Sequence, residues 1–170
     1  MSRAADPLPD AFRDWFATRG WRPRAHQLRL LELARAGTSA LLIAPTGAGK
    51  TLAGFLPTLV EAQACGRGTN RGLHTLYISP LKALAVDIAR NLEAPVAEIG
   101  LDLRIETRTG DTSAAKRARQ RRDPPDVLLT TPEQLALLLV GPDAAPMFST
   151  LRRVVLDELH AIVTSKRGDL

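Results

Sequence analysis

Cysteine is nearly absent from this 170-residue sequence, in which Cys65 is the only one. A single thiol excludes an internal disulfide and any zinc site that is built from several cysteines. This usage is compatible with a reducing cytoplasm, which is where we expect the protein to act.

Long apolar runs are also absent, the longest being Leu135–Val140. A helix that spans a bilayer needs roughly 20 apolar residues. The first ten residues carry two prolines, two aspartates and no apolar run, so they do not resemble a secretory signal. We therefore expect neither a membrane anchor nor a membrane partner.

The composition is that of a globular protein, with 45% hydrophobic and 24% charged residues, and the length suits one domain. Lys and Arg number 23 against 18 acidic residues, which gives a net charge of +5. This excess suits a polyanionic partner, although solubility alone can explain it. The densest basic run is Lys116–Arg122, which could follow a phosphate backbone or form a solvated helix face.

Short apolar runs alternate with longer amphipathic stretches from Ser39 onward. The runs are Ala40–Ile43, Thr75–Ile78, Leu103–Ile105, Val127–Leu129 and Val154–Leu156. Most are apolar on both faces, which is typical of parallel strands covered by helices on both sides. Between the second and third runs, apolar side chains recur at helical spacing at Leu81, Leu84, Ile88 and Leu92. The pattern predicts an α/β fold with a parallel sheet.

Two helices are predicted before the first strand, around Ala11–Thr18 and from Pro23 to Gly37. We therefore divide the chain into an N-terminal helical segment, residues 1–37, and a sheet domain, residues 38–170. Gly66–Gly72 reads as an exposed loop within that domain.

The strongest chemical signal is the segment Ala44–Thr51, which follows the first strand and leads into a helical pattern. Its glycines allow a tight turn whose amides point at phosphate oxygens beside the positive end of a helix. A lysine then reaches the β- and γ-phosphates, and a hydroxyl coordinates Mg²⁺. The predicted nucleotide-binding residues are Thr46, Gly47, Ala48, Gly49, Lys50 and Thr51, with Thr51 as a metal ligand. The general P-loop pattern begins with glycine, where this chain has Ala44.

An acidic pair, Asp157 and Glu158, follows the last apolar run. A parallel strand would deliver both carboxylates to the edge of the sheet where the P-loop lies. We expect Asp157 to hold Mg²⁺ and Glu158 to position and deprotonate the water that attacks the γ-phosphate. Such a pair can also simply favour the start of the next helix.

Together, Ala44–Thr51 and Asp157-Glu158-Leu159-His160 resemble motifs I and II of superfamily 2 helicases. The resemblance implies a RecA-like ATP-binding domain that uses ATP and Mg²⁺, cut off just past motif II. It also implies that His160 couples the nucleotide state to nucleic-acid contacts, and that Gln27 reads the adenine edge. From the sequence alone, Gln27 fits an exposed helix glutamine equally well.

Three loops resemble the family's nucleic-acid motifs: Ser79–Leu84, Thr109–Asp111 and Thr130–Glu133. Each follows a strand and offers amides and hydroxyls that suit phosphate oxygens. The residues expected to contact nucleic acid are Pro80, Lys82, Gly110, Thr131 and Pro132.

A closer resemblance, to the Lhr family and most of all to its ligase-associated helicases, rests on Pro80–Leu84, Thr131–Glu133, Asp157–His160 (the DELH box) and Ser165–Gly168. Leu159 departs from the large residue expected there. The resemblance implies single-stranded DNA as the track, a role in DNA repair, and a DNA ligase and nuclease as functional partners. It also implies a second RecA-like domain, winged-helix parts and a Ser-Ala-Thr strand between the P-loop and DELH strands. Without them, we expect little ATPase and no unwinding activity.

Two other functions fit the same residues. One is an RNA helicase of the DEAD or DExH type, because the residues that would recognise a 2′-hydroxyl are not identifiable here. The other is a non-catalytic module that binds nucleotide or nucleic acid. No Asn-Lys-x-Asp guanine motif occurs in the sequence, which disfavours a GTPase.

Overall fold

The computed structural model describes residues 7–65 and 72–163, which form parts of two compact units. One unit is Met1–Gly66 with Pro95–Asp102, and the other is Arg67–Ala94 with Leu103–Leu170. Each is described by itself. Within the described residues, no helix is both long and apolar enough to cross a membrane.

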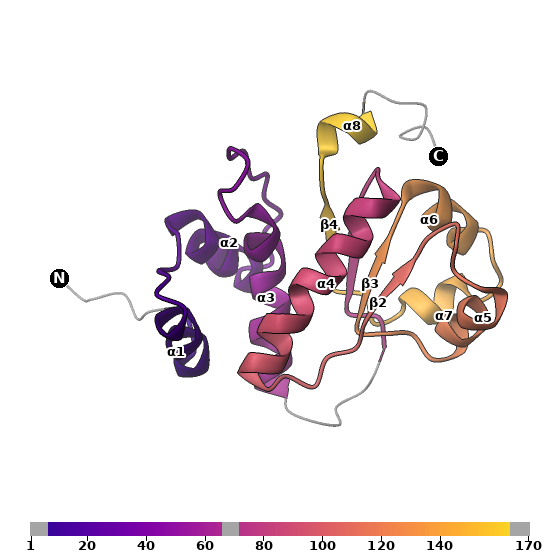
Figure 1. Ribbon diagram of the computed structural model, residues 1–170. Helices are drawn as coiled ribbons and strands as arrows, with labels where there is room; N and C mark the ends of the chain where they lie inside the picture. Colours follow the sequence, from indigo (N-terminus) through magenta and orange to yellow (C-terminus); the bar gives the residue numbers. More distant parts are fainter. Residues whose placement is uncertain (1–6, 66–71, 164–170) are drawn as a thin grey trace. The chain divides into compact units, whose positions relative to one another are not determined.

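Three helices form the first unit: α1 (Asp10–Thr18), α2 (Ala25–Arg35) and α3 (Lys50–Cys65) (Figure 1). The first two confirm the predicted helices, although α2 begins at Ala25 rather than Pro23. The backbone N–H of Arg24 donates to the Gln27 side chain over 2.8 Å, which fixes this start. Trp15 Nε1 and Arg19 Nε, in and just after α1, donate to Glu98 Oε2 over 2.7 and 2.9 Å.

The prediction of a strand at Ala40–Ile43 is wrong, because these residues adopt no regular secondary structure. Leu41 and Ile43 are 71% and 87% exposed. A strand exists only through pairing, and no strand of the described residues pairs with this segment. The apolar run Ala40–Ile43, which precedes the P-loop in the sequence, therefore forms no strand and leaves Leu41 and Ile43 exposed.

The second unit contains a four-stranded parallel sheet in the order β2-β3-β1-β4 (Figure 1). The strands are β1 (Thr75–Ile78), β2 (Ile105–Arg108), β3 (Val127–Thr130) and β4 (Arg153–Leu156). The helices are α5 (Ala114–Arg122), α6 (Pro132–Leu139), α7 (Ala144–Phe148), α8 (Leu159–Val163) and α4 (Lys82–Ile99), which runs into the first unit. The predicted parallel α/β sheet is confirmed, with β2 starting at the last residue of the predicted run.

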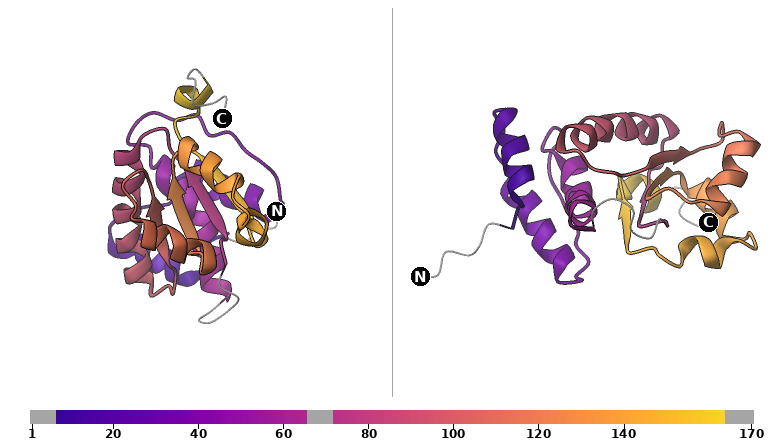
Figure 2. Two further views of the ribbon diagram at one scale, coloured as in Figure 1. Left: turned by 90° about the vertical axis from the view of Figure 1, so that its right-hand side faces the viewer. Right: turned by 90° about the horizontal axis from the view of Figure 1, so that it is seen from below.

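Alternation along the strands assigns side chains to two faces of the sheet. One face carries Leu76, Ile78 and Leu128, which pack with Leu138 of α6 and Met147 of α7. The first part of α4 lies on the opposite side of the strands from α6 and α7 (Figures 1 and 2). In α4 the buried stripe is Ala85, Ile88 and Leu92, whereas Leu81, which the spacing had included, lies before the helix and is 58% exposed.

Strand β4 differs from β1 and β3, which are buried throughout. It is an edge strand, and Val154 and Leu156 are each half exposed. Its apolar sequence had predicted a strand covered on both faces, and that coverage is missing within the described residues.

Candidate nucleotide and nucleic-acid site

The P-loop segment forms a tight turn directly before α3 in the first unit. Gly47 and Gly49 adopt left-handed backbone angles, with φ of +77° and +73°. These angles are strained for residues that carry a Cβ, so the two glycines are required for this turn. The Ala48 N–H donates to the Pro45 carbonyl over 3.2 Å, which closes the loop.

The Lys50 side chain folds back over this loop. Its Nζ donates to the carbonyl of Ala44 over 2.9 Å and to that of Pro45 over 3.3 Å. The ammonium group is thus placed beside the amides of the turn, at the start of α3. A cation and a helix N-terminus together form an arrangement that can hold phosphate.

Two side chains of α2 contact backbone carbonyls of the P-loop. His26 Nε2 lies 2.9 Å from the carbonyl oxygen of Ala48, and Gln27 Nε2 donates to that of Gly49 over 3.4 Å. Gln27 is only 3% exposed, so the alternative of an exposed helix glutamine is wrong. His26, which is not among the predicted site residues, contacts the loop that Gly47 and Gly49 shape. Its position next to Gln27 in the sequence was the signal that could have revealed this.

The acidic pair follows β4 in the second unit. The Asp157 N–H donates to the Ile78 carbonyl over 3.0 Å, which extends the pairing of β4 with β1 by one residue. Tyr77 Oη donates to Asp157 Oδ2. Burial, and then this bond to Asp157, raise the pKa of the Tyr77 hydroxyl far above its ordinary value.

Glu158 is the one described residue other than glycine with a left-handed backbone, at φ +48°. Its N–H donates to Asp157 Oδ1 over 2.9 Å, and its carbonyl accepts from the Ala161 N–H in α8 over 2.7 Å. Such a conformation costs about 1–3 kcal/mol and persists at functional sites. His160 Nδ1 lies 3.4 Å from Glu158 Oε2, on the exposed side of this turn.

The predicted nucleic-acid loops meet at one edge of the sheet. The last residues of the four strands, Arg108, Thr130, Ile78 and Leu156, are in register, so all the following loops begin at one level. Of the five predicted contacts, Lys82 and Gly110 are exposed, and Pro80, Thr131 and Pro132 are buried. Of the buried three, only Thr131 has hydrogen-bond donors, its N–H and its hydroxyl, because proline has no backbone N–H.

Two of these loops are tied to one another and to α5. Lys82 forms an ion pair with Asp111. Arg117 donates to the Gly110 carbonyl over 2.7 Å, and Thr109 N–H donates to Thr112 Oγ1 over 2.9 Å. Contacts from α4, from α5 and within the loop itself therefore stabilise the conformation of the loop after β2.

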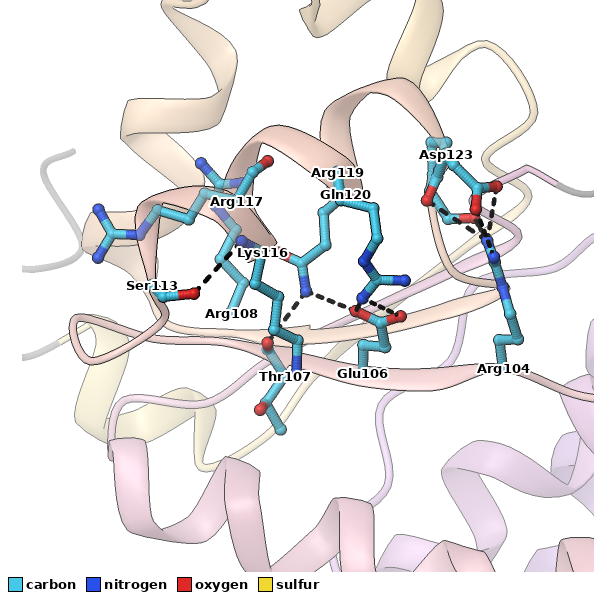
Figure 3. A network of polar contacts seen from close by, with 11 residues as sticks. Arg104, Glu106, Thr107, Arg108, Ser113, Lys116, Arg117, Arg119, Gln120 and Asp123 are labelled. Atoms are coloured by element: carbon cyan, nitrogen blue, oxygen red, sulfur yellow. Dashed lines mark hydrogen bonds and ion pairs between the residues drawn. The ribbon is translucent and has the colours of Figure 1, made fainter.

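A polar network joins β2 to α5 (Figure 3). Glu106 accepts hydrogen bonds from Arg119 over 2.7 Å and from Gln120 over 2.9 Å. Arg108, 3% exposed, donates to the Arg117 carbonyl over 3.3 Å, and burial and then the charges of Arg121 and Arg117 lower its pKa. At least two residues of the basic run, Arg117 and Arg119, are thus engaged within the fold rather than solvated.

The structure brings the predicted residues together in two groups. The first unit gathers Gln27 with the P-loop, and the second gathers the DELH box with the loops after β1, β2 and β3. Ser165–Gly168 and most of Gly66–Gly72 lie outside the described residues. Among described residues, no group of three or more His, Cys, Asp or Glu could form a metal cage. The Asp157 carboxylate of the second unit is a hard oxygen donor of the kind that Mg²⁺ prefers.

Comparisons with known proteins identify helicases as relatives of this chain. A model of the DEAD/DEAH box helicase family matches residues 24–170. The Lhr helicase/uracil glycosylase of Escherichia coli is 41% identical over 99% of this chain and 12% of its own length. ATP-dependent helicase Lhr-Core of Methanothermobacter thermautotrophicus is 40% identical over 85% of this chain and 18% of its own length.

The solved structures that match this chain are also helicases. The Mycobacterium smegmatis helicase Lhr bound to ssDNA and AMP-PNP matches with a TM-score of 0.84 and 38% identity, over 96% of this chain and 22% of that one. The DEAD-box helicase Mss116, 20% identical with a TM-score of 0.78, shares the fold. This chain thus spans less than a quarter of the length of these Lhr relatives.

Proposed function

The chain belongs to the DEAD/DEAH box helicase family, and on that premise we propose that it is the ATP-binding motor part of an Lhr-type DNA helicase. Within the longer protein, it would bind ATP and step along single-stranded DNA together with a second RecA-like domain. The sequence resemblance further supports a cytoplasmic role in DNA repair beside a ligase and a nuclease.

The P-loop is the observation that carries this proposal. Its left-handed glycines, the helix that starts at Lys50 and the Lys50 ammonium form a cradle for anions. In that cradle, phosphate oxygens would replace the carbonyls of Ala44 and Pro45 as partners of Lys50, because the ammonium is attracted more strongly to an anionic oxygen than to a neutral carbonyl. Thr46, Ala48 and Thr51 would complete the nucleotide contacts. The packing of Gln27 against Gly49 supports adenine reading next to the loop.

Asp157 and Thr51 would hold Mg²⁺, which supplies charge neutralisation at the β- and γ-phosphates when it is bound. Glu158 would orient the attacking water and accept its proton, since its carboxylate is exposed just beyond the sheet edge. His160, beside Glu158, would transmit the state of that carboxylate to the nucleic-acid loops.

Single-stranded DNA is the track that we propose, because the solved Lhr relative, 38% identical, is described as bound to ssDNA. Lys82, at the start of α4, and the backbone around Gly110, Thr131 and Pro132 would follow its phosphates. A strand that displaced Asp111 from Lys82 would replace one anionic partner by another.

Substitution of Glu158 tests the proposal in the full-length protein that contains this chain. Glu158→Gln should lower the ATPase kcat roughly 10²–10⁴-fold while ATP binding is retained, since only the proton acceptor is lost. Lys50→Ala should instead abolish ATP binding, measured by calorimetric titration.

The outcomes separate the alternatives. Loss of ATP binding in Glu158→Gln would mean that its role is misassigned. Stimulation of the wild-type ATPase by RNA but not by single-stranded DNA would favour an RNA helicase. Binding of ATP without turnover in the full-length protein would favour a non-catalytic module.

A further inference from the structure

Tyr77 is the only tyrosine of the chain, and it lies in the interior of the sheet. The residue is 1% exposed on β1. In the register of the parallel pair, Tyr77 is opposite Val155 of β4, so Asp157, two residues further on, shares its face of the sheet. The hydroxyl therefore reaches along the next strand to Asp157 Oδ2.

Three hydrogen bonds hold the side chain and the backbone N–H of Asp157 at the start of the DELH box. Asp157 Oδ2 accepts from Tyr77, Oδ1 accepts from the Glu158 N–H over 2.9 Å, and the Asp157 N–H donates to Ile78 over 3.0 Å. Two of these three bonds come from β1. The orientation of Asp157, and through it the left-handed turn at Glu158, depends on that neighbouring strand.

From this geometry we propose that Tyr77 is a positioning residue that orients the Asp157 carboxylate for binding Mg²⁺. The inference rests on the proposed function. Each oxygen of a carboxylate has two acceptor positions. With one on each taken by Tyr77 and by the Glu158 amide, one position on each oxygen would remain to accept from a cation or its bound water. Partners that orient a metal ligand typically change metal affinity when they are removed.

The neutral phenol suits this task because it donates without competing for the metal. A phenylalanine would preserve the packing of the ring while leaving Asp157 Oδ2 without its donor. The contribution of the hydroxyl can thus be removed with little change in volume.

The test is Tyr77→Phe in the full-length protein that contains this chain. We expect Mn²⁺ affinity, measured by electron paramagnetic resonance in the presence of a non-hydrolysable ATP analogue, to weaken about 10-fold. The Mg²⁺ concentration for half-maximal ATPase should rise by the same factor. Metal-free binding of the analogue should stay as in the wild type, because the hydroxyl acts only through Asp157.

A matched control is Thr75→Val, which removes another buried hydroxyl from the same strand. Thr75 is fully buried and its Oγ1 lies 2.8 Å from His74 Nδ1. This variant should lower the melting temperature without changing Mn²⁺ affinity. Equal loss of Mn²⁺ affinity in both variants would mean a general structural effect and would overturn the proposal.

A double-mutant cycle separates positioning from packing. In an Asp157→Asn background, Tyr77→Phe should cause no further loss of Mn²⁺ affinity, whereas a packing effect would add in both backgrounds. Wild-type affinity in Tyr77→Phe would refute the role of Tyr77 alone. Absence of metal-dependent nucleotide binding in the wild type would instead refute the proposed function.

Discussion

At the scale of single residues, backbone angles decide which side chains the P-loop tolerates. The sequence predicted glycine-dependent turning at Gly47 and Gly49, and both have left-handed backbones. What the sequence did not indicate is how closely Gln27 approaches: a Cβ on Gly49 would lie 2.9 Å from Gln27 Nε2. Gly49 is therefore needed both for the left-handed turn and for the close approach of the Gln27 side chain.

We expect Gly49→Ala to destabilise the protein by more than the roughly 1–2 kcal/mol that a left-handed alanine costs, and to weaken ATP binding. Denaturant unfolding and calorimetric titration measure the two effects. Gly37→Ala is the control, because Gly37 has φ +67° with nothing within 4 Å of a Cβ. It should show the backbone cost alone and bind ATP normally. Normal ATP binding by Gly49→Ala would contradict the proposed role of the Gln27 contact.

Polar side chains were the residues that the sequence could not place. Tyr77 lies within an apolar run that predicted a strand, yet its hydroxyl contacts Asp157 at the end of the neighbouring strand. His26 read as an ordinary helix residue and contacts Ala48. Neither contact has a periodic signal, because both join residues distant in sequence.

At the scale of elements, helix α5 is fixed to β2 by ionic hydrogen bonds. The run Lys116–Arg122 has little apolar surface, and the charge pattern alone left open a phosphate site or a solvated face. Burial raises the pKa of Glu106, but hydrogen bonds from Gln120 and Arg119 outweigh it, and the net pKa is lowered. The helix therefore docks through its polar groups.

This lowered pKa predicts a pH dependence of stability. A carboxyl whose pKa is lower in the folded state stabilises the fold above its unfolded pKa, and loses that effect as the pH falls through the folded value. The free energy of unfolding of the wild type should therefore exceed that of Glu106→Gln at neutral pH. The difference should shrink below about pH 4, near the ordinary glutamate value. Urea titrations at several pH values measure it, and a difference that grows on acidification would contradict the assignment.

At the scale of the whole molecule, two apolar segments lack the strand pairing and the burial that are expected for apolar strands, within the described residues. Ala40–Ile43 is extended with Leu41 and Ile43 exposed, and β4 has one unpaired edge within the described residues. Exposed strand edges attract further strands. The family resemblance predicts a Ser-Ala-Thr strand, which could pair with such an edge.

Hydrogen exchange can test this pairing. In the 170-residue chain, the amides of Leu41–Ile43 should exchange nearly as fast as an unfolded peptide, because they have no strand partner. In the full-length protein, the same amides should become strongly protected, and those of Val154–Leu156 more protected than before. Unchanged exchange in the longer protein would show that no strand pairs with either segment.

By itself, the sequence determined the local features: the parallel α/β pattern at β1, β3 and β4, the helices and the glycine turn. These follow from side-chain periodicity and from backbone sterics, which act over a few residues. Only the tertiary structure decided that Ala40–Ile43 forms no strand, that β4 is an edge, and that Tyr77 meets Asp157. Strand pairing and polar contacts between strands require a partner that is distant in the chain, and the local sequence does not specify whether it is there.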